Sequence, residues 1–251
     1  MAWVRPRDLT IRPVLGLGDD DLSAIVSGIN VNPLDSLWME QKTNIRHSDL
    51  LLFLHHHPNL QALGLRRDSL RPSSLTTPDP SALSWITSLS TPALYIPHLI
   101  PVTPDLTNIT IEFLPVHIFA SKRVAFSVPQ YERALDCVAS LPGSHALTLT
   151  LSFPPDESTL PWLNNDYGGA NPLEARLSRV TDLLVSGNLH GMTGFSTATL
   201  RALPPWLRLF PGLRRFTVIP GSRQSTMLAS ERQELVKAIT DACPGVEDVT
   251  V

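Results

Sequence analysis

The sequence predicts an α/β repeat protein, a solenoid in which units of helix, turn and short strand are stacked. The main observation is a recurring phrase: proline, a small or polar residue, an apolar residue, two free positions, an apolar residue, one free position and a last apolar residue. Full copies begin at Pro58, Pro104, Pro211 and Pro244. Repeats with a period of tens of residues are typical of stacked supersecondary units rather than of one closed globule.

The last part of each copy has the two-residue period of a strand with one buried face, as in Leu63 and Leu65. The proline at the front disfavours helical geometry in the residue before it, so a preceding helix should end there. Helical patterns do precede the phrase, at 50–57 and at 231–243. We therefore expect each unit to be a helix, a proline turn and a strand.

Two weaker copies lie in the middle of the chain. Pro142 is followed by Leu147 and Leu149 at the expected offsets, and Ser178 replaces proline before Leu183. The steps between the six copies are 46, 38, 36, 33 and 33 residues. The alternative is an irregular α/β domain whose strands happen to begin after proline.

The repeat predicts parallel strands that are neighbours in one curved sheet, joined by right-handed crossovers. The strands are expected near 60–65, 106–111, 146–151, 180–185, 213–218 and 246–251. The side chains expected to be buried are Leu63, Leu65, Ile109, Ile111, Leu147, Leu149, Leu183, Val185, Phe216, Val218, Val249 and Val251.

The sections outside the phrase are expected to be less regular. Residues 1–47 are interpreted as an N-terminal irregular or capping section, with a possible first strand at Leu9–Ile11, and residues 48–251 as the irregular repeat domain. The intervals 66–98 and 154–172 are interpreted as surface excursions, and the first of them is expected to hold a helix through Trp85 and Leu89.

Composition argues against several classes of partner. The net charge of -3 gives no basic footprint for nucleic acid. The longest apolar run, Leu50–Leu54, is far shorter than the ~20 residues of a membrane span. No apolar signal-peptide core is seen at the N-terminus, and Cys137 and Cys243 suit a reducing compartment. We therefore expect no nucleic-acid or membrane binding, and a cytoplasmic or nuclear location.

The chain offers no pattern for catalysis, a cofactor or a metal. His55–His57 end a predicted helix, where cationic side chains suit the helix dipole, and no further ligands lie nearby in sequence. Gly16–Gly18 resemble a phosphate loop only in their glycines, because aspartates follow and no Lys-Ser or Lys-Thr does. We expect a protein that is not an enzyme; an enzyme on an irregular α/β fold is a remote alternative.

Three stretches resemble leucine-rich-repeat proteins: 50–65, Leu183–Asn188 and Ala238–Val251. In its general sequence pattern the chain also resembles the irregular repeat regions of fungal F-box proteins. The resemblance implies a parallel sheet on the concave face of a curved stack, with helices outside. It also implies a non-enzymatic protein-interaction module, with substrate recruitment to a ubiquitin ligase as its more specific role. Residues 20–38 do not reproduce an F-box, which puts binding of the ligase adaptor in doubt. The alternative function is a structural scaffold or degenerate family member without a dedicated ligand.

The residues that alternate with the buried set predict a binding surface on the open face of the sheet. Their charges are mixed in sign, which favours a protein partner over a polyanion. Threonines recur along the middle of this face and equally suit plain packing between strands. The predicted partner-binding residues are Arg66, Asn108, Thr110, Glu112, Thr148, Asp182, Arg215 and Thr217.

Overall fold

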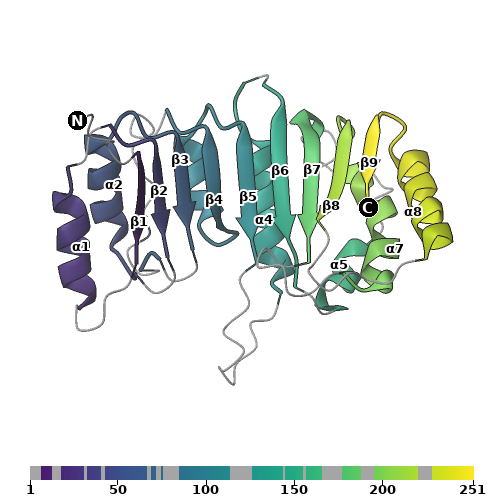
Figure 1. Ribbon diagram of the computed structural model, residues 1–251, viewed down its shortest axis with the longest axis horizontal. Helices are drawn as coiled ribbons and strands as arrows, with labels where there is room; N and C mark the ends of the chain where they lie inside the picture. Colours follow the sequence, from purple (N-terminus) through teal and green to yellow (C-terminus); the bar gives the residue numbers. More distant parts are fainter. Residues whose placement is uncertain are drawn as a thin grey trace, which may run out of the picture. The chain divides into compact units, whose positions relative to one another are not determined.

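The protein is an α/β protein with a nine-stranded parallel sheet, in which the strands follow one another in chain order from β1 to β9 (Figure 1). The chain forms two compact units, residues 1–108 with 141–143, and residues 109–140 with 144–251. The computed structural model describes residues 7–12, 18–30, 33–40, 43–66, 69–71, 75, 85–113, 126–143, 145–154, 157–165, 177–187, 195–219 and 228–251.

In the first unit, the described helices are two of ten residues and one of four, each lying between two strands. Its elements are β1 (Asp8–Ile11), α1 (Asp19–Gly28), β2 (Ser36–Met39), α2 (His47–His56), β3 (Ala62–Leu65), β4 (Ser88–Pro92), α3 (Ile96–Leu99) and a 3-10 turn at Ile100–Val102. Parallel pairs join β1 to β2, β2 to β3 and β3 to β4.

The second unit contains the two longest of the described helices. Its elements are β5 (Asn108–Glu112, of which the first residue belongs to the first unit), α4 (Val128–Ala139), β6 (Leu147–Ser152), α5 (Leu160–Leu163), β7 (Val180–Ser186), α7 (Thr197–Trp206), β8 (Arg215–Ile219), α8 (Ala229–Ala242) and β9 (Asp248–Thr250), with 3-10 turns at Glu157–Thr159, Leu177–Arg179 and Leu207–Leu209. Parallel pairs join β6 to β7, β7 to β8 and β8 to β9.

The six predicted strands are confirmed as β3, β5, β6, β7, β8 and β9. They are not all neighbours, because β4 lies between β3 and β5 in the sheet order. The first sequence step of 46 residues therefore covers two strand-to-strand steps, from β3 to β4 and from β4 to β5. The strand β4 also replaces the helix expected through Leu89. The possible first strand at Leu9–Ile11 is confirmed as β1, and β2 is a further strand within residues 1–47.

Each of the four prolines in the full copies lies in a turn of the same type. The residue before each proline has a φ between -131° and -118° and a ψ between 65° and 81°, outside the helical region, as expected before proline. Its carbonyl accepts a hydrogen bond, 3.0 to 3.4 Å long, from the N–H three residues later. Proline suits the second position of such a turn because its φ is fixed. The carbonyls belong to His57, Thr103, Phe210 and Cys243, and the N–H groups to Leu60, Leu106, Leu213 and Val246.

A second recurring set of hydrogen bonds links each strand start to the start of the next strand in the sheet. The carbonyl just before a strand accepts two N–H groups from the residues that begin the next strand. The carbonyl of Asp35, for example, accepts from Gln61 at 2.9 Å and from Ala62 at 3.1 Å. The same pair of bonds occurs at the carbonyls of Arg7, Gln61, Thr87 and Arg214. These bonds hold neighbouring strands in a fixed register.

Ten of the twelve strand residues predicted to be buried are buried, each with 7% of its surface exposed or less. Val249 and Val251 are only half-buried. They lie in and after β9, which is last in the sheet order and pairs with β8. The strand interior therefore follows the predicted alternation, and the exception falls where a strand has a neighbour on one side.

The core of the second unit is aromatic. The ring of Phe153 meets Trp162 and Trp206 edge-on, with ring centroids 6.0 and 5.8 Å apart. Tyr131 donates a hydrogen bond of 2.7 Å to the carbonyl of Ser152. Burial of Trp162 in α5 corrects the interpretation of 154–172 as a surface excursion, at least for the described residues 157–165.

Gly212 should tolerate no larger residue. It occupies the third position of the Pro211 turn, and an added Cβ would lie 1.8 Å from the carbonyl oxygen of Ser178. We expect Gly212→Ala to lower the free energy of unfolding by about 1–3 kcal/mol in urea titrations, because backbone must move to relieve the overlap. Gly245→Ala, at the same turn position, is the control: its nearest atom would be 3.6 Å away. Equal stability of the two variants would contradict this account.

The stability of the protein should fall on mild acidification. His47 in α2 is fully buried, and burial lowers its pKa below the ordinary value near 6.5, an effect to which the charge of His98 adds. Below about pH 6.5 the unfolded chain binds a proton that the folded chain binds less tightly, so the free energy of unfolding decreases as the pH falls toward the folded-state pKa. Urea unfolding of the wild type should show a larger loss between pH 7.5 and 5.5 than unfolding of His47→Gln. Identical losses would remove His47 as the cause.

Candidate functional site

The first unit has an open face that consists of the strand residues alternating with the buried ones. Leu37, Leu63 and Leu89 are buried, and because successive strand side chains point to opposite sides, their neighbours face the other way. The open face of the first unit comprises Asp8, Thr10, Ser36, Trp38, Ala62, Gly64, Ser88 and Ser90.

Trp38 is the largest side chain on this open face, with 39% of its surface exposed. Its backbone pairs with that of Gly64 on the neighbouring strand. A Cβ added to Gly64 would lie 2.0 Å from Cε3 of the indole, so the ring rests directly on the glycine backbone. The missing side chain at Gly64 therefore lets an exposed tryptophan lie flat across β3.

The surroundings of Trp38 are small and polar. Ser90 follows Gly64 in the same row, and Ala62 and Ser88 lie in the next row. Ser36 donates a hydrogen bond of 2.5 Å to the carboxylate of Asp8, which orders the start of the face. The result is one rigid aromatic ring on a surface of small residues.

The predicted binding residues near β3 and β5 differ in accessibility. Arg66 follows β3 and is half-buried, Asn108 is exposed, and Thr110 is half-buried. Glu112 has only 6% of its surface exposed, which differs from the expected open position. Burial raises the pKa of Tyr131, and the charge of Glu112 adds to that rise.

In the second unit, the structure brings three of the predicted residues into one row across the strands. Thr148 pairs with Asp182, and Asp182 pairs with Arg215. Arg215 donates through Nε to the Asp182 carboxylate. Burial alone would raise the pKa of Asp182, but the hydrogen bonds from Arg215 and Thr181 together lower it. These two charges form an ion pair with each other. Thr217 is half-buried and pairs with Leu184 and Thr250 on the neighbouring strands.

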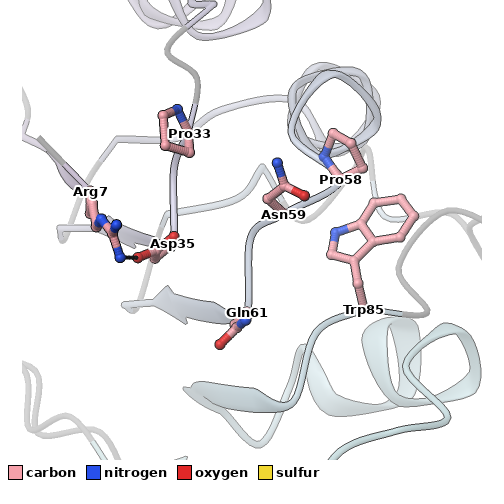
Figure 2. Close-up of a pocket in the computed structure, with 7 residues that line it drawn as sticks. All are labelled: Arg7, Pro33, Asp35, Pro58, Asn59, Gln61 and Trp85. Carbon is pink, nitrogen blue, oxygen red and sulfur yellow. Dashed lines mark hydrogen bonds and ion pairs between the residues drawn. The ribbon is translucent and has the colours of Figure 1, made fainter. Parts of the chain in front are cut away.

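A separate hollow lies beside the starts of β1, β2 and β3 (Figure 2). Its volume is about 450 Å³. An ion pair of 3.4 Å between Arg7 and Asp35 lies on one side, and the indole of Trp85 on the other. We call it the strand-start hollow; its residues are Arg7, Pro33, Asp35, Pro58, Asn59, Gln61 and Trp85.

Sequence reasoning missed both tryptophans. Trp38 stands between Leu37 and Met39 and reads as part of an apolar run, and Trp85 was assigned to a helix. The signal that could have found Trp38 is Gly64, the only glycine in the middle positions of the predicted strands.

The other local features of the sequence have structural explanations or cannot be placed. His57 is buried, stacks on Phe53 with ring centroids 4.0 Å apart, and shares a hydrogen bond of 2.7 Å with the carbonyl of that residue. Gly16 lies outside the described residues. In the part of the chain that is described, no three His, Cys, Asp or Glu residues are grouped to hold a metal ion. No helix there is long and apolar enough to cross a membrane.

Comparison with known proteins gives no family for this chain. No protein-family model matches it, and no curated protein matches it either. Its function must therefore be argued from the surfaces described above.

The pKa of Asp182 provides a direct check of the ion pair on β7 and β8. In Arg215→Met, the Asp182 pKa should rise, because burial remains and the main hydrogen-bond donor is lost. Carboxyl ¹³C titration by NMR measures this pKa. Arg214→Met is the control, since Arg214 lies 3.9 Å from Glu247 and not beside Asp182. An unchanged Asp182 pKa in Arg215→Met would mean that the pair does not form in solution.

Proposed function

We propose that this chain is a non-enzymatic protein-interaction module that binds a partner protein through the open face of its first unit. The observation that supports this proposal most is Trp38, an exposed indole held flat on Gly64. Tryptophan is enriched among the residues that dominate binding energy at protein interfaces. A ring that is already fixed loses little conformational entropy on binding.

The charges near this face favour a protein over a polyanion. Asp8 stands at one end of the strands and Arg66 at the other, so neither sign predominates. Nucleic-acid surfaces, by contrast, need clustered positive charge. A flat aromatic ring among small residues offers instead a surface on which an apolar side chain of a partner can pack.

The more specific form of the proposal is a leucine-rich-repeat-like solenoid that serves as a substrate receptor related to F-box subunits. The repeated proline turn and the parallel strand order support stacked repeats. The ligase role rests on the sequence resemblance alone. Recovery of a ligase adaptor with the full-length gene product would support that role, and the plain interaction module does not require it.

Loss of Trp38 should remove the partner without unfolding the protein. We expect Trp38→Ala to keep the wild-type melting temperature within a few degrees and to deplete one or more proteins about tenfold in quantitative affinity purification, as loss of an interface hot spot would. The matched control is Leu52→Ala on α2, which removes an exposed apolar side chain, 45% exposed, from the helical layer.

In a direct binding measurement with the purified partner, Trp38→Ala should then show a weaker affinity than the wild type, and Leu52→Ala should not. Retention of every captured protein by Trp38→Ala would contradict binding through this face. Equal losses in Trp38→Ala and Leu52→Ala would indicate nonspecific adhesion and favour the alternative of a scaffold without a dedicated ligand.

A further inference from the structure

The strand-start hollow is a second candidate site, distinct from the open face. Its seven residues come from the segments that precede β1, β2, β3 and β4, whereas Trp38 lies inside β2. A volume of about 450 Å³ lies within the range of ligand pockets. Pro33, Pro58 and Trp85 supply apolar surface, and Asn59 and Gln61 supply amides (Figure 2).

Hydrogen bonding in this hollow must come mainly from side chains. The backbone carbonyls of Arg7, Asp35 and Gln61 each already accept hydrogen bonds from two N–H groups at the start of the next strand. The side chains of Asn59 and Gln61 remain, on residues that are exposed. Each amide offers donors and an acceptor, which is the pattern that recognises a peptide backbone.

Trp85 adds a donor that has no internal partner. Its indole nitrogen is buried and makes no hydrogen bond among the described residues. Figure 2 shows this nitrogen turned toward the hollow, on the side of Asn59. A buried donor without an acceptor is unfavourable, so a ligand that brings an acceptor to this point gains free energy.

The charges of the hollow are balanced. Arg7 and Asp35 form an ion pair with each other, at 3.4 Å. A charged ligand would have to compete with that pair, whereas a neutral ligand would not. The hollow therefore suits an uncharged ligand with carbonyl acceptors and flat apolar groups.

We propose that the strand-start hollow binds a proline-rich, extended segment of a partner protein. A polyproline II segment makes no internal hydrogen bonds, so all its carbonyls are free to accept from Trp85, Asn59 and Gln61. Its prolines carry no N–H and bring no unpaired donor into the site. Their rings pack on Pro58 and on the Trp85 indole, as in the aromatic-lined grooves that recognise such segments.

The test uses a fluorescein-labelled decaproline peptide and fluorescence anisotropy with the full chain. The wild type should bind with a Kd below about 1 mM, and a Gly-Ser peptide of equal length should bind at least about tenfold more weakly. Trp85→Phe keeps an aromatic ring and removes the N–H, and should weaken decaproline binding about five- to tenfold. Trp38→Ala should bind decaproline like the wild type.

Each other outcome overturns the proposal. Absence of decaproline binding, or equal binding of the Gly-Ser peptide, rules out recognition of a proline-rich segment. Wild-type affinity in a folded Trp85→Phe variant rules out donation by the indole. Because Trp38 and Trp85 are tested separately, failure here leaves the open-face function untouched, and failure of the open-face test leaves this site untouched.

Discussion

At five strand starts, one backbone carbonyl accepts a pair of hydrogen bonds from the beginning of the next strand, and these bonds are the constraint on which the rest of the structure depends. At Asp35, for instance, both Gln61 and Ala62 donate to one oxygen, which fixes where β3 begins relative to β2. Strand side chains alternate between faces, so a slip of one residue would expose Leu63 and bury its neighbours. The proline turn sets up this bond, since it ends the helix and delivers the chain to the strand at the same point in each full copy.

Both candidate surfaces follow from that register. Trp38 can lie flat only because Gly64, and not Leu63 or Leu65, stands opposite it in the next strand. The strand-start hollow depends on the same alignment, because Arg7, Asp35 and Gln61 occupy equivalent positions before three successive strands. Because the backbone carbonyls of these three residues already accept hydrogen bonds from the next strand, a ligand at this edge contacts side chains instead. A regular backbone thus leaves binding to the side chains on its surface.

The sequence predicted the strands that carry the phrase and a possible strand at Leu9–Ile11, but it missed β2 and β4, which lack the phrase. The strand β4 reads Ser-Leu-Ser-Thr-Pro, so Leu89 is its one large apolar residue and the buried Thr91 hides the alternation. Trp38 was overlooked because a tryptophan between two apolar residues is usually core, and only pairing with Gly64 shows otherwise. The predicted site residues Asp182 and Arg215 pair on neighbouring strands, and their mutual ion pair depends on side-chain geometry that no periodicity encodes.

The irregular spacing of the phrase has a physical origin in the helical layer. Equivalent strand residues are 26 positions apart across α2, as from Ser36 to Ala62, but 33 apart across α8, as from Arg215 to Asp248. The step falls to 20 between Thr87 and Thr107, where the connection holds only the four-residue α3 and a 3-10 turn. The bonds at the strand starts are the same at each of these steps, so the strand layer stays regular while helices of different length take up the difference. A pattern of fixed period can therefore match only part of this chain, even though its strands follow one rule.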